Sequence, residues 1–210
     1  EEFDKQRDPT EIPRWSDFIS NIKDVLSQGQ RREMAIAAFS FVGMQSVYTN
    51  FTITYLYEDL GFSLEEAGEI LGFATLLAIP ARILWGWVGS TIFQPRVLLA
   101  FLALVMAVST ALMGAFDDQW GHVAVLIVNC AISLSVLSWH GVLLSEAARL
   151  APAGEAGRLT GGVLAFGALG QIIFPMIFAA GYWLSGYGLA FTVISLPAAM
   201  VGVIFLLWRR

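Results

Sequence analysis

Long, uninterrupted apolar segments are the feature that most constrains how this chain folds. Six of them follow one another between residues 33 and 208, each separated from the next by a short turn. A bilayer core about 30 Å thick is crossed by roughly 20 apolar residues of helix, and every segment reaches that length. Because the segments do not alternate between apolar and polar residues, they indicate helices rather than strands. The predicted spans are about 33–58, 65–91, 96–116, 121–149, 156–184 and 188–208.

The composition agrees with a membrane protein. Hydrophobic residues make up 57% of the 210 residues and charged residues only 14%, whereas soluble domains are about a quarter charged. We therefore expect an all-α, polytopic membrane protein whose backbone polar groups are satisfied within helices. Cys130 is the single cysteine, so an intrachain disulfide is excluded.

The charges in the turns predict the orientation of the spans. The first, third and fifth turns contain no Lys or Arg, and every basic residue except Arg82 falls in the other connections or near the two ends of the chain. Cytoplasmic loops of membrane proteins are enriched in basic residues. Both termini are therefore expected in the cytoplasm.

The first 32 residues differ from the rest of the chain. Residues 1–12 are charged and contain proline, as in a flexible linker. From Trp15 onward, apolar residues recur at helical spacing opposite charged ones, which predicts an amphipathic helix on the membrane surface. A packed helix of a small soluble segment is the alternative. The expected division is a cytoplasmic linker with a surface helix in contact with lipid, 1–32, and a transmembrane domain, 33–210.

One charge, Arg82, lies within the apolar length of a predicted span, 65–91. A charge at membrane depth costs at least about 2.5 kcal/mol to insert, so we expect Arg82 to face protein or water and to have a function or a structural partner. It shares a helix face with small residues, and such a face lets another helix approach closely. The other members of that face are Gly68, Gly72, Thr75, Ile79, Gly86 and Gly89.

Two further spans carry polar stripes. Polar groups at membrane depth face protein or a water-filled cavity, so the stripes predict either a substrate cavity or hydrogen bonds that hold helices together. The first stripe comprises Gln45, Tyr48, Thr52 and Tyr55, and the second comprises Asn129, Ser133 and His140. Histidine is the side chain type that can titrate near neutral pH, so His140 either carries a proton during transport or is an ordinary buried histidine.

Two other features are candidates for function. Gln171 lies midway along 156–184, beside glycines and a proline that weaken the helix, and there its amide would be available to a polar ligand. Glu146 and Arg149 are three residues apart near the end of a span. This spacing predicts an ion pair at a helix end, with a gating or structural role rather than a ligand site.

A short internal repeat suggests that the six spans form two triplets. Glu66-Ala67-Gly68 recurs as Glu155-Ala156-Gly157. Spans one to three would then match spans four to six, and because three is odd the second triplet would be inverted in the membrane, as in many transporters. Chance identity between two apolar helices is the alternative.

Motifs of other functional classes are absent from the sequence. It contains no Gly-x-Ser-x-Gly, no His-Glu-x-x-His, no phosphate-binding loop and no Cys/His cluster with the spacing of a metal site. No basic patch suits nucleic acid. We therefore expect a protein that is not an enzyme and that has no metal, no cofactor and no nucleic-acid partner.

Three stretches together resemble a known family. Pro80-Ala81-Arg82-Ile83-Leu84-Trp85-Gly86-Trp87-Val88-Gly89, followed by Pro95-Arg96, is similar to the Gly-rich loop motif between the second and third helices of each half of Major Facilitator Superfamily transporters. The stretch from Trp139-His140-Gly141 to Pro152, with Gly157-Arg158 and Gly161-Gly162, is similar to the tenth and eleventh helices of many bacterial members. The amphipathic stretch before Arg31 is similar to the linker between the halves. The chain thus resembles the C-terminal half, helices seven to twelve.

The resemblance implies six helices in two inverted triplets, which share a central cavity with an N-terminal six-helix half. Arg82 would then attract an anionic substrate group or hold a cytoplasmic gate, and its place nearer the cytoplasmic end favours the gate. The cytoplasmic loop motif would comprise Gly86, Gly89 and Arg96. The candidates for lining the substrate cavity are Gln45, Tyr48, Asn129, His140 and Gln171.

The function implied by the resemblance is secondary active transport of a small solute by alternating access, as a symporter or antiporter driven by a gradient of protons or of another solute. The implied location is the bacterial inner membrane, and this chain is expected to be the C-terminal half of the transporter. Two alternatives stay open. One is a half-size transporter that pairs with a copy of itself, and the other is a non-transporting six-helix membrane protein, such as a sensor or an intramembrane enzyme.

Overall fold

The computed structural model describes residues 15–117 and 119–207, and within these residues it contains seven helices and no strand. The all-α prediction is thus confirmed for this part of the chain. The predicted linker segment 1–12 and the basic pair Arg209-Arg210 lie outside the described residues. The helices are α1 (Trp15–Ser27), α2 (Gly29–Glu58), α3 (Leu64–Thr91), α4 (Pro95–Met113), α5 (His122–Val136), α6 (His140–Arg149) and α7 (Ala156–Leu207).

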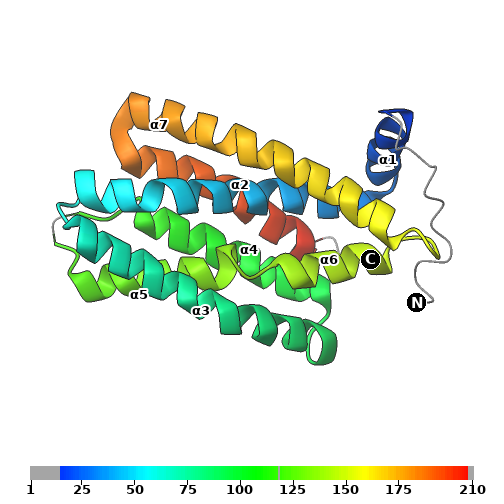
Figure 1. Cartoon of the computed structure of the whole chain (residues 1–210), viewed down its shortest axis with the longest axis horizontal. Helices are drawn as coiled ribbons and strands as arrows, with labels where there is room; N and C mark the ends of the chain where they lie inside the picture. Colours follow the sequence, from blue (N-terminus) through cyan, green and yellow to red (C-terminus); the bar gives the residue numbers. More distant parts are fainter. Residues whose placement is uncertain (1–14, 118, 208–210) are drawn as a thin grey trace.

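Four stretches of the described residues are long and apolar enough to cross a membrane, and the chain is a multi-pass membrane protein. They are Leu64–Thr91, Pro95–Met113, His122–Arg149 and Ala156–Leu207. The third joins α5 and α6 across a short break. The fourth, α7, has non-helical backbone at Ser185 and Gly186, where the φ of Gly186 is 78°. A residue without a side chain adopts this conformation readily, and α7 folds back there into two neighbouring arms (Figure 1).

Several boundaries differ from the predicted spans. The span predicted as 121–149 is interrupted between Val136 and His140. The composition of the sequence does not reveal this break, because apolar residues continue through it at Leu137 and Trp139. In the structure, Leu137, Ser138 and Trp139 are as buried as the helices on either side. The helix predicted from residue 33 begins at Gly29, separated from α1 by Gln28 alone. The helix predicted as 96–116 ends at Met113.

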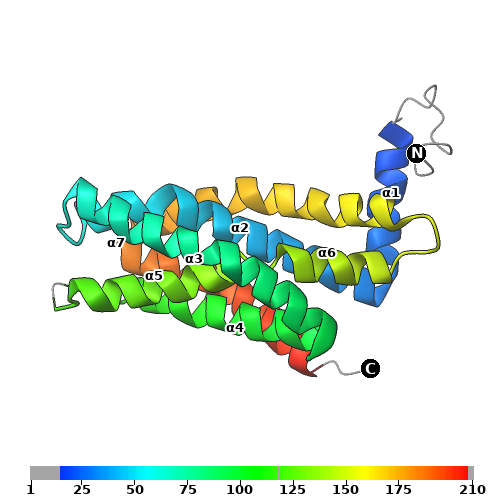
Figure 2. The ribbon, with the colours of Figure 1, turned by 60° about the horizontal axis from the view of Figure 1, so that its bottom comes forward.

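The helices α2 to α7 lie side by side along one direction (Figure 1), and α1 crosses one end of them at a steep angle (Figure 2). The helix α7 packs mainly against α2 and α4, and α3 packs mainly against α5. Glycines allow these close approaches. A Cβ atom on Gly170 of α7 would lie 2.0 Å from the carbonyl oxygen of Phe39 in α2.

The described basic residues gather at one end of the bundle, and the opposite end carries acidic residues. The end next to α1, here called the basic end, carries Arg31, Arg32, Arg96, Arg149 and Arg158. The opposite end, here called the acidic end, carries Glu58, Asp59, Glu65, Glu66 and Asp117. Among the Lys and Arg residues that the structure describes, only Arg82 lies between the two ends.

Candidate functional site

Arg82 lies in α3 opposite the break between α5 and α6. Its Nε donates a hydrogen bond to the carbonyl oxygen of Leu137 at 2.8 Å. Within the described residues, the two Nη nitrogens have no hydrogen-bond partner, and the residue is exposed. One edge of the guanidinium is therefore held by the protein, and the other is available to water or to a ligand.

The break supplies the carbonyl that Arg82 uses. The last carbonyls of a helix have no partner within it, and α5 ends at Val136, just before Leu137. Two more hydrogen bonds join α3 to this end of α5. Trp85 donates its indole N–H to the carbonyl of Leu134 at 2.8 Å, and the Ser138 hydroxyl donates to the carbonyl of Ala78 at 3.3 Å. Hydrogen bonds thus hold α3 against the end of α5 at the level of Arg82.

His140 is the first residue of α6 and follows the break directly. Its ring stacks on the ring of Trp139, with the centroids 3.9 Å apart. Its Nδ1 is buried and has no hydrogen-bond partner among the described residues. Arg82 is close enough to act on this imidazole electrostatically. The structure therefore brings together two of the residues that the sequence singled out, Arg82 and His140.

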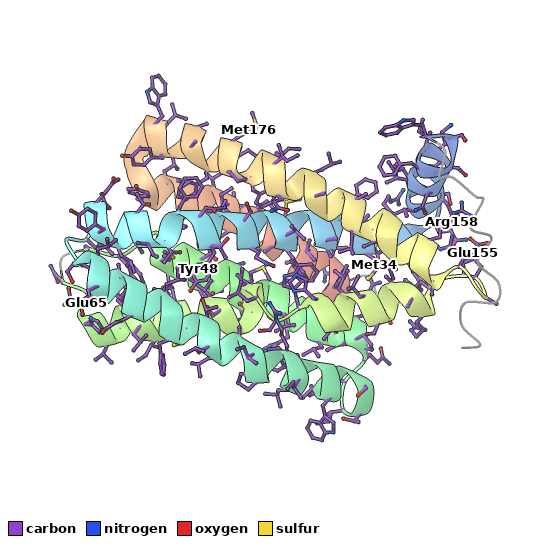
Figure 3. The ribbon with its side chains drawn as sticks, in the orientation of Figure 1. Met34, Tyr48, Glu65, Glu155, Arg158 and Met176 are labelled. Carbon is purple, nitrogen blue, oxygen red and sulfur yellow. The ribbon has the colours of Figure 1, made fainter. Side chains whose placement is uncertain are left out.

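Tyr48 and Asn129 lie inside the bundle, between α2 and α5, and Figure 3 shows Tyr48 in this interior position. They are only 3% and 0% exposed. The Tyr48 hydroxyl lies 3.3 Å from the carbonyl oxygen of Asn129, to which it donates, and 3.0 Å from the hydroxyl of Ser133. Such contacts hold α2 against α5. A role for the two residues in a substrate cavity stays a prediction.

Gln45 and Gln171 belong to the neighbouring helices α2 and α7. Gln45 is half-buried, and its Oε1 has no partner among the described residues. Gln171 is exposed, and its backbone carbonyl accepts a hydrogen bond from Ser46 at 3.2 Å. Neither side chain is hydrogen-bonded to Arg82 or His140 in the part of the chain that the structure describes.

The predicted loop residue Arg96 and the predicted pair Glu146 and Arg149 meet at the basic end. All three line one pocket of about 330 Å³. Both oxygens of the buried Glu146 carboxylate bind the Arg149 guanidinium, at 2.8 and 2.6 Å. Arg96 pairs with Glu33, and its Nε donates to the carbonyl of Phe205 at 3.3 Å. These contacts connect α2, α4 and the end of α7.

The two loop-motif glycines differ in their surroundings. A Cβ on Gly89 would lie 3.2 Å from the side chain of Leu98, whereas a Cβ on Gly86 would meet nothing within 4 Å. Gly68 and Gly72, on the same face as Gly86 and Arg82, also have open space around them. Among the described residues, nothing lies within 4 Å of a Cβ atom placed on any of these three glycines.

Sequence reasoning missed the residues that hold Arg82 and Arg96 in place. Trp85, Ser138 and Glu33 each make a hydrogen bond or ion pair described above. The spacing of Trp85, one helical turn after Arg82, was the available signal, because residues three apart lie on one side of a helix. Ser138 and Glu33 carried no comparable signal. Among the described residues, no group of three or more His, Cys, Asp and Glu residues could hold a metal ion.

Comparison with known proteins gives two similar relatives. Both are named "Probable nitrate/nitrite transporter NarK2" and come from Mycobacterium tuberculosis, from the strains CDC 1551 / Oshkosh and ATCC 25618 / H37Rv. Each is 35% identical over 138 residues, which cover 64% of this chain and 33% of the relative. The match thus spans about a third of the length of these relatives. No family model matches the chain.

Proposed function

We propose that this chain is the C-terminal six-helix half of a Major Facilitator Superfamily secondary transporter, and that the solute is a small anion bound by Arg82. The observation that carries this proposal is the state of the Arg82 guanidinium. It belongs to an apolar helix, it is held through Nε by Leu137, and its Nη nitrogens are free of partners among the described residues.

A bound anion explains why such a charge is present at membrane depth. An ionised side chain there is costly unless it faces water or a partner of opposite charge. The two Nη groups of an arginine donate parallel hydrogen bonds to two oxygens of one oxyanion. Nitrate and nitrite are small oxyanions of this kind. The similarity to proteins named as probable nitrate/nitrite transporters therefore supports an anion as the solute.

The sequence alone favoured a gating role for Arg82. Nine residues of helix separate it from Thr91, a rise of about 13 Å, so it lies nearer the basic end than the acidic end. A gate held by Arg82 needs a contact that forms in one state of the transporter and breaks in the other. Among the described residues, Arg82 has one acceptor, the carbonyl of Leu137, and it binds Nε alone. We therefore prefer the anion-binding role.

In the proposed architecture the membrane is crossed six times, by α2, α3, α4, α5 with α6, and the two arms of α7. These crossings form two inverted triplets within a domain of residues 33–210, and the linker 1–32 lies in the cytoplasm of a bacterial cell. The open space around Gly68, Gly72 and Gly86 of α3 supports a partner half, because it leaves room for another helix. Transport then proceeds by rocking of the two halves around the site, coupled to protons or to a second anion.

Uptake of nitrate and nitrite into liposomes that contain the intact protein tests the proposal. Arg82→Gln is expected to reduce uptake at low anion concentration by about ten- to a hundredfold, because hydrogen bonds to a charged group are lost. Arg82→Lys keeps the charge without the paired donors, so it is expected to lose less. The control Arg32→Gln alters an exposed arginine at the basic end and is expected to behave as wild type.

Two results would contradict the proposal. One is wild-type protein that takes up neither anion, which would leave the non-transporting alternative. The other is Arg82→Gln protein with wild-type uptake. The mass of the native protein separates the remaining alternative, since a half-size transporter has the 22.9 kDa of this chain and a two-half transporter is about twice as large.

A further inference from the structure

We infer that Trp85, together with Ser138, is a positioning residue for anion binding. The two residues fix the end of α5 so that the Leu137 carbonyl engages Nε of Arg82 and leaves the Nη edge free. This inference rests on the proposed function, because it assigns the geometry of the Arg82 site. Neither Trp85 nor Ser138 is required to touch the anion.

The end of α5 is fixed only in part by its own backbone, through the amide of Leu137, which donates to the carbonyl of Ser133 at 3.2 Å. In a continuing helix, the amide of Ser138 would donate to the carbonyl of Leu134, four residues earlier. Here it donates to Ser135 at 3.4 Å instead. The carbonyl of Leu134 accepts the indole N–H of Trp85 at 2.8 Å. Trp85 thus supplies the partner that the broken helix lacks, and it does so from the same helix as Arg82.

Ser138 makes a second link in the opposite direction. This residue is 1% exposed, and its hydroxyl lies 3.3 Å from the carbonyl of Ala78 in α3 and 3.4 Å from the carbonyl of Ser133 in α5. The shorter of these two contacts joins the helices. Ala78 lies one turn before Arg82, and Trp85 lies one turn after it. The Leu137 carbonyl is therefore held between two hydrogen bonds that both join α5 to α3, and its distance to Arg82 is set by the backbone of two helices.

The position of the Leu137 carbonyl decides which edge of the guanidinium is presented to a ligand. A carbonyl bonded to Nε leaves both Nη groups together on the other edge, and these two groups bind two oxygens of one anion. A carbonyl shifted toward an Nη group would occupy one of that pair. The planar guanidinium loses little freedom on binding when it is already oriented, so loss of this orientation is expected to weaken anion binding.

A packing role for the Trp85 ring can be separated from the role of its N–H. The ring lies against that of Phe101, with the centroids 6.1 Å apart. Trp85→Phe keeps an aromatic ring and removes the donor. The matched control is Trp87→Phe on the same helix, because Trp87 is 56% exposed and its indole donates no hydrogen bond within the described residues.

The test measures KM and kcat for nitrate and nitrite uptake by the intact protein in liposomes. Trp85→Phe is expected to raise KM by about three- to tenfold, the effect of one lost hydrogen bond, with little change in kcat. Trp87→Phe is expected to leave both constants at their wild-type values. In an Arg82→Lys background Trp85→Phe is expected to have no further effect, because lysine has no Nε–H to orient and the two changes are then not additive.

The inference is overturned if Trp85→Phe and Trp87→Phe give the same KM, or if Trp85→Phe raises KM by the same factor in both backgrounds. If Arg82→Lys abolishes uptake, Ser138→Ala decides the question. It is expected to raise KM, whereas Ser145→Ala, whose hydroxyl bonds only within its own helix, is not. Wild-type protein without saturable anion uptake would overturn the proposed function as well. Saturable, Arg82-dependent uptake with a silent Trp85→Phe would overturn this inference alone.

Discussion

Gly170 sets how closely α7 approaches α2. A Cβ atom there would lie 2.0 Å from the Phe39 carbonyl oxygen, and a backbone atom cannot turn away as a flexible side chain can. We expect Gly170→Ala to force the helices apart and to destabilise the protein by about 1–3 kcal/mol, as overpacking usually does. Thermal unfolding of the detergent-solubilised protein measures the loss. Gly161→Ala, in the same helix with open space around it, is the control, and equal melting temperatures for the two variants would contradict this account.

At the scale of single residues, the sequence predicted that a charged side chain in an apolar helix needs a partner, but it did not predict which group the partner is. The cost of a charge in an apolar helix indicated that Arg82 has one, and the structure identifies the Leu137 carbonyl. A backbone carbonyl carries no sequence signature, and this one is available only because α5 ends beside it. The polar stripes were ambiguous for a similar reason. Tyr48 faces α5 rather than open space. A stripe that packs against a helix and a stripe that lines a cavity have the same periodicity in the sequence.

The helix α1 packs one face against the bundle and exposes another. Asn21 and Val25 face the bundle, where the Asn21 amide donates to the carbonyl of Arg158 at 2.8 Å. Figure 3 shows Arg158 beside α1 at the basic end. A second face exposes Trp15 and Ile19, which are 83% and 52% exposed. The arrangement suits a helix at the surface of a bilayer, with its apolar side toward lipid.

Quenching by spin-labelled lipid tests this placement of α1. In a Cys130→Ala background, a fluorescent label on Ile19→Cys is expected to be quenched by lipids that carry a nitroxide near the headgroup. The same label on Ser20→Cys, which is exposed about a quarter-turn away on the polar side, is expected to be quenched much less. Equal quenching at the two positions, or none at either, would show that α1 does not rest on lipid.

At the scale of helices, the existence of the long elements followed from apolar length, and the break between α5 and α6 did not. Residues 137–139 contain neither proline nor glycine, the usual signals of an interruption. The break depends on hydrogen bonds from Trp85 and Ser138 across to another helix. Such tertiary contacts are invisible to a reading of local sequence, although they shape the candidate site.

For the whole molecule, the distribution of the basic residues predicts which end faces the cytoplasm. Arg158 lies at the basic end, and Glu65 lies at the acidic end. Because basic residues are retained in the cytoplasm, we expect a membrane-impermeant maleimide to label Glu65→Cys in intact cells. Arg158→Cys is expected to react only after the cells are permeabilised. Both substitutions belong in the Cys130→Ala background. Labelling of Arg158→Cys from outside would reverse the orientation.

The class of the molecule was the part most accessible to sequence. An excess of apolar residues in long runs allows few solutions other than a bundle of membrane helices, and the structure confirms the all-helical, multi-pass class. The inverted repeat and the partner half stay predictions. The inverted repeat concerns how the two triplets of spans within this chain are related. The partner half concerns the rest of a transporter, and the match covers only about a third of the relatives' length.

Binding of the anion at Arg82 is the central claim, and its most direct test is the thermal shift that nitrate or nitrite produces in the purified protein. A ligand that binds only the folded state stabilises it by about 2.7 kcal/mol at a hundred times its Kd. We predict that the melting temperature of the wild type, and of the Arg32→Gln control, rises with anion concentration. That of Arg82→Gln is predicted to stay constant. An equal rise in wild type and Arg82→Gln, or no rise in the wild type, would contradict the account.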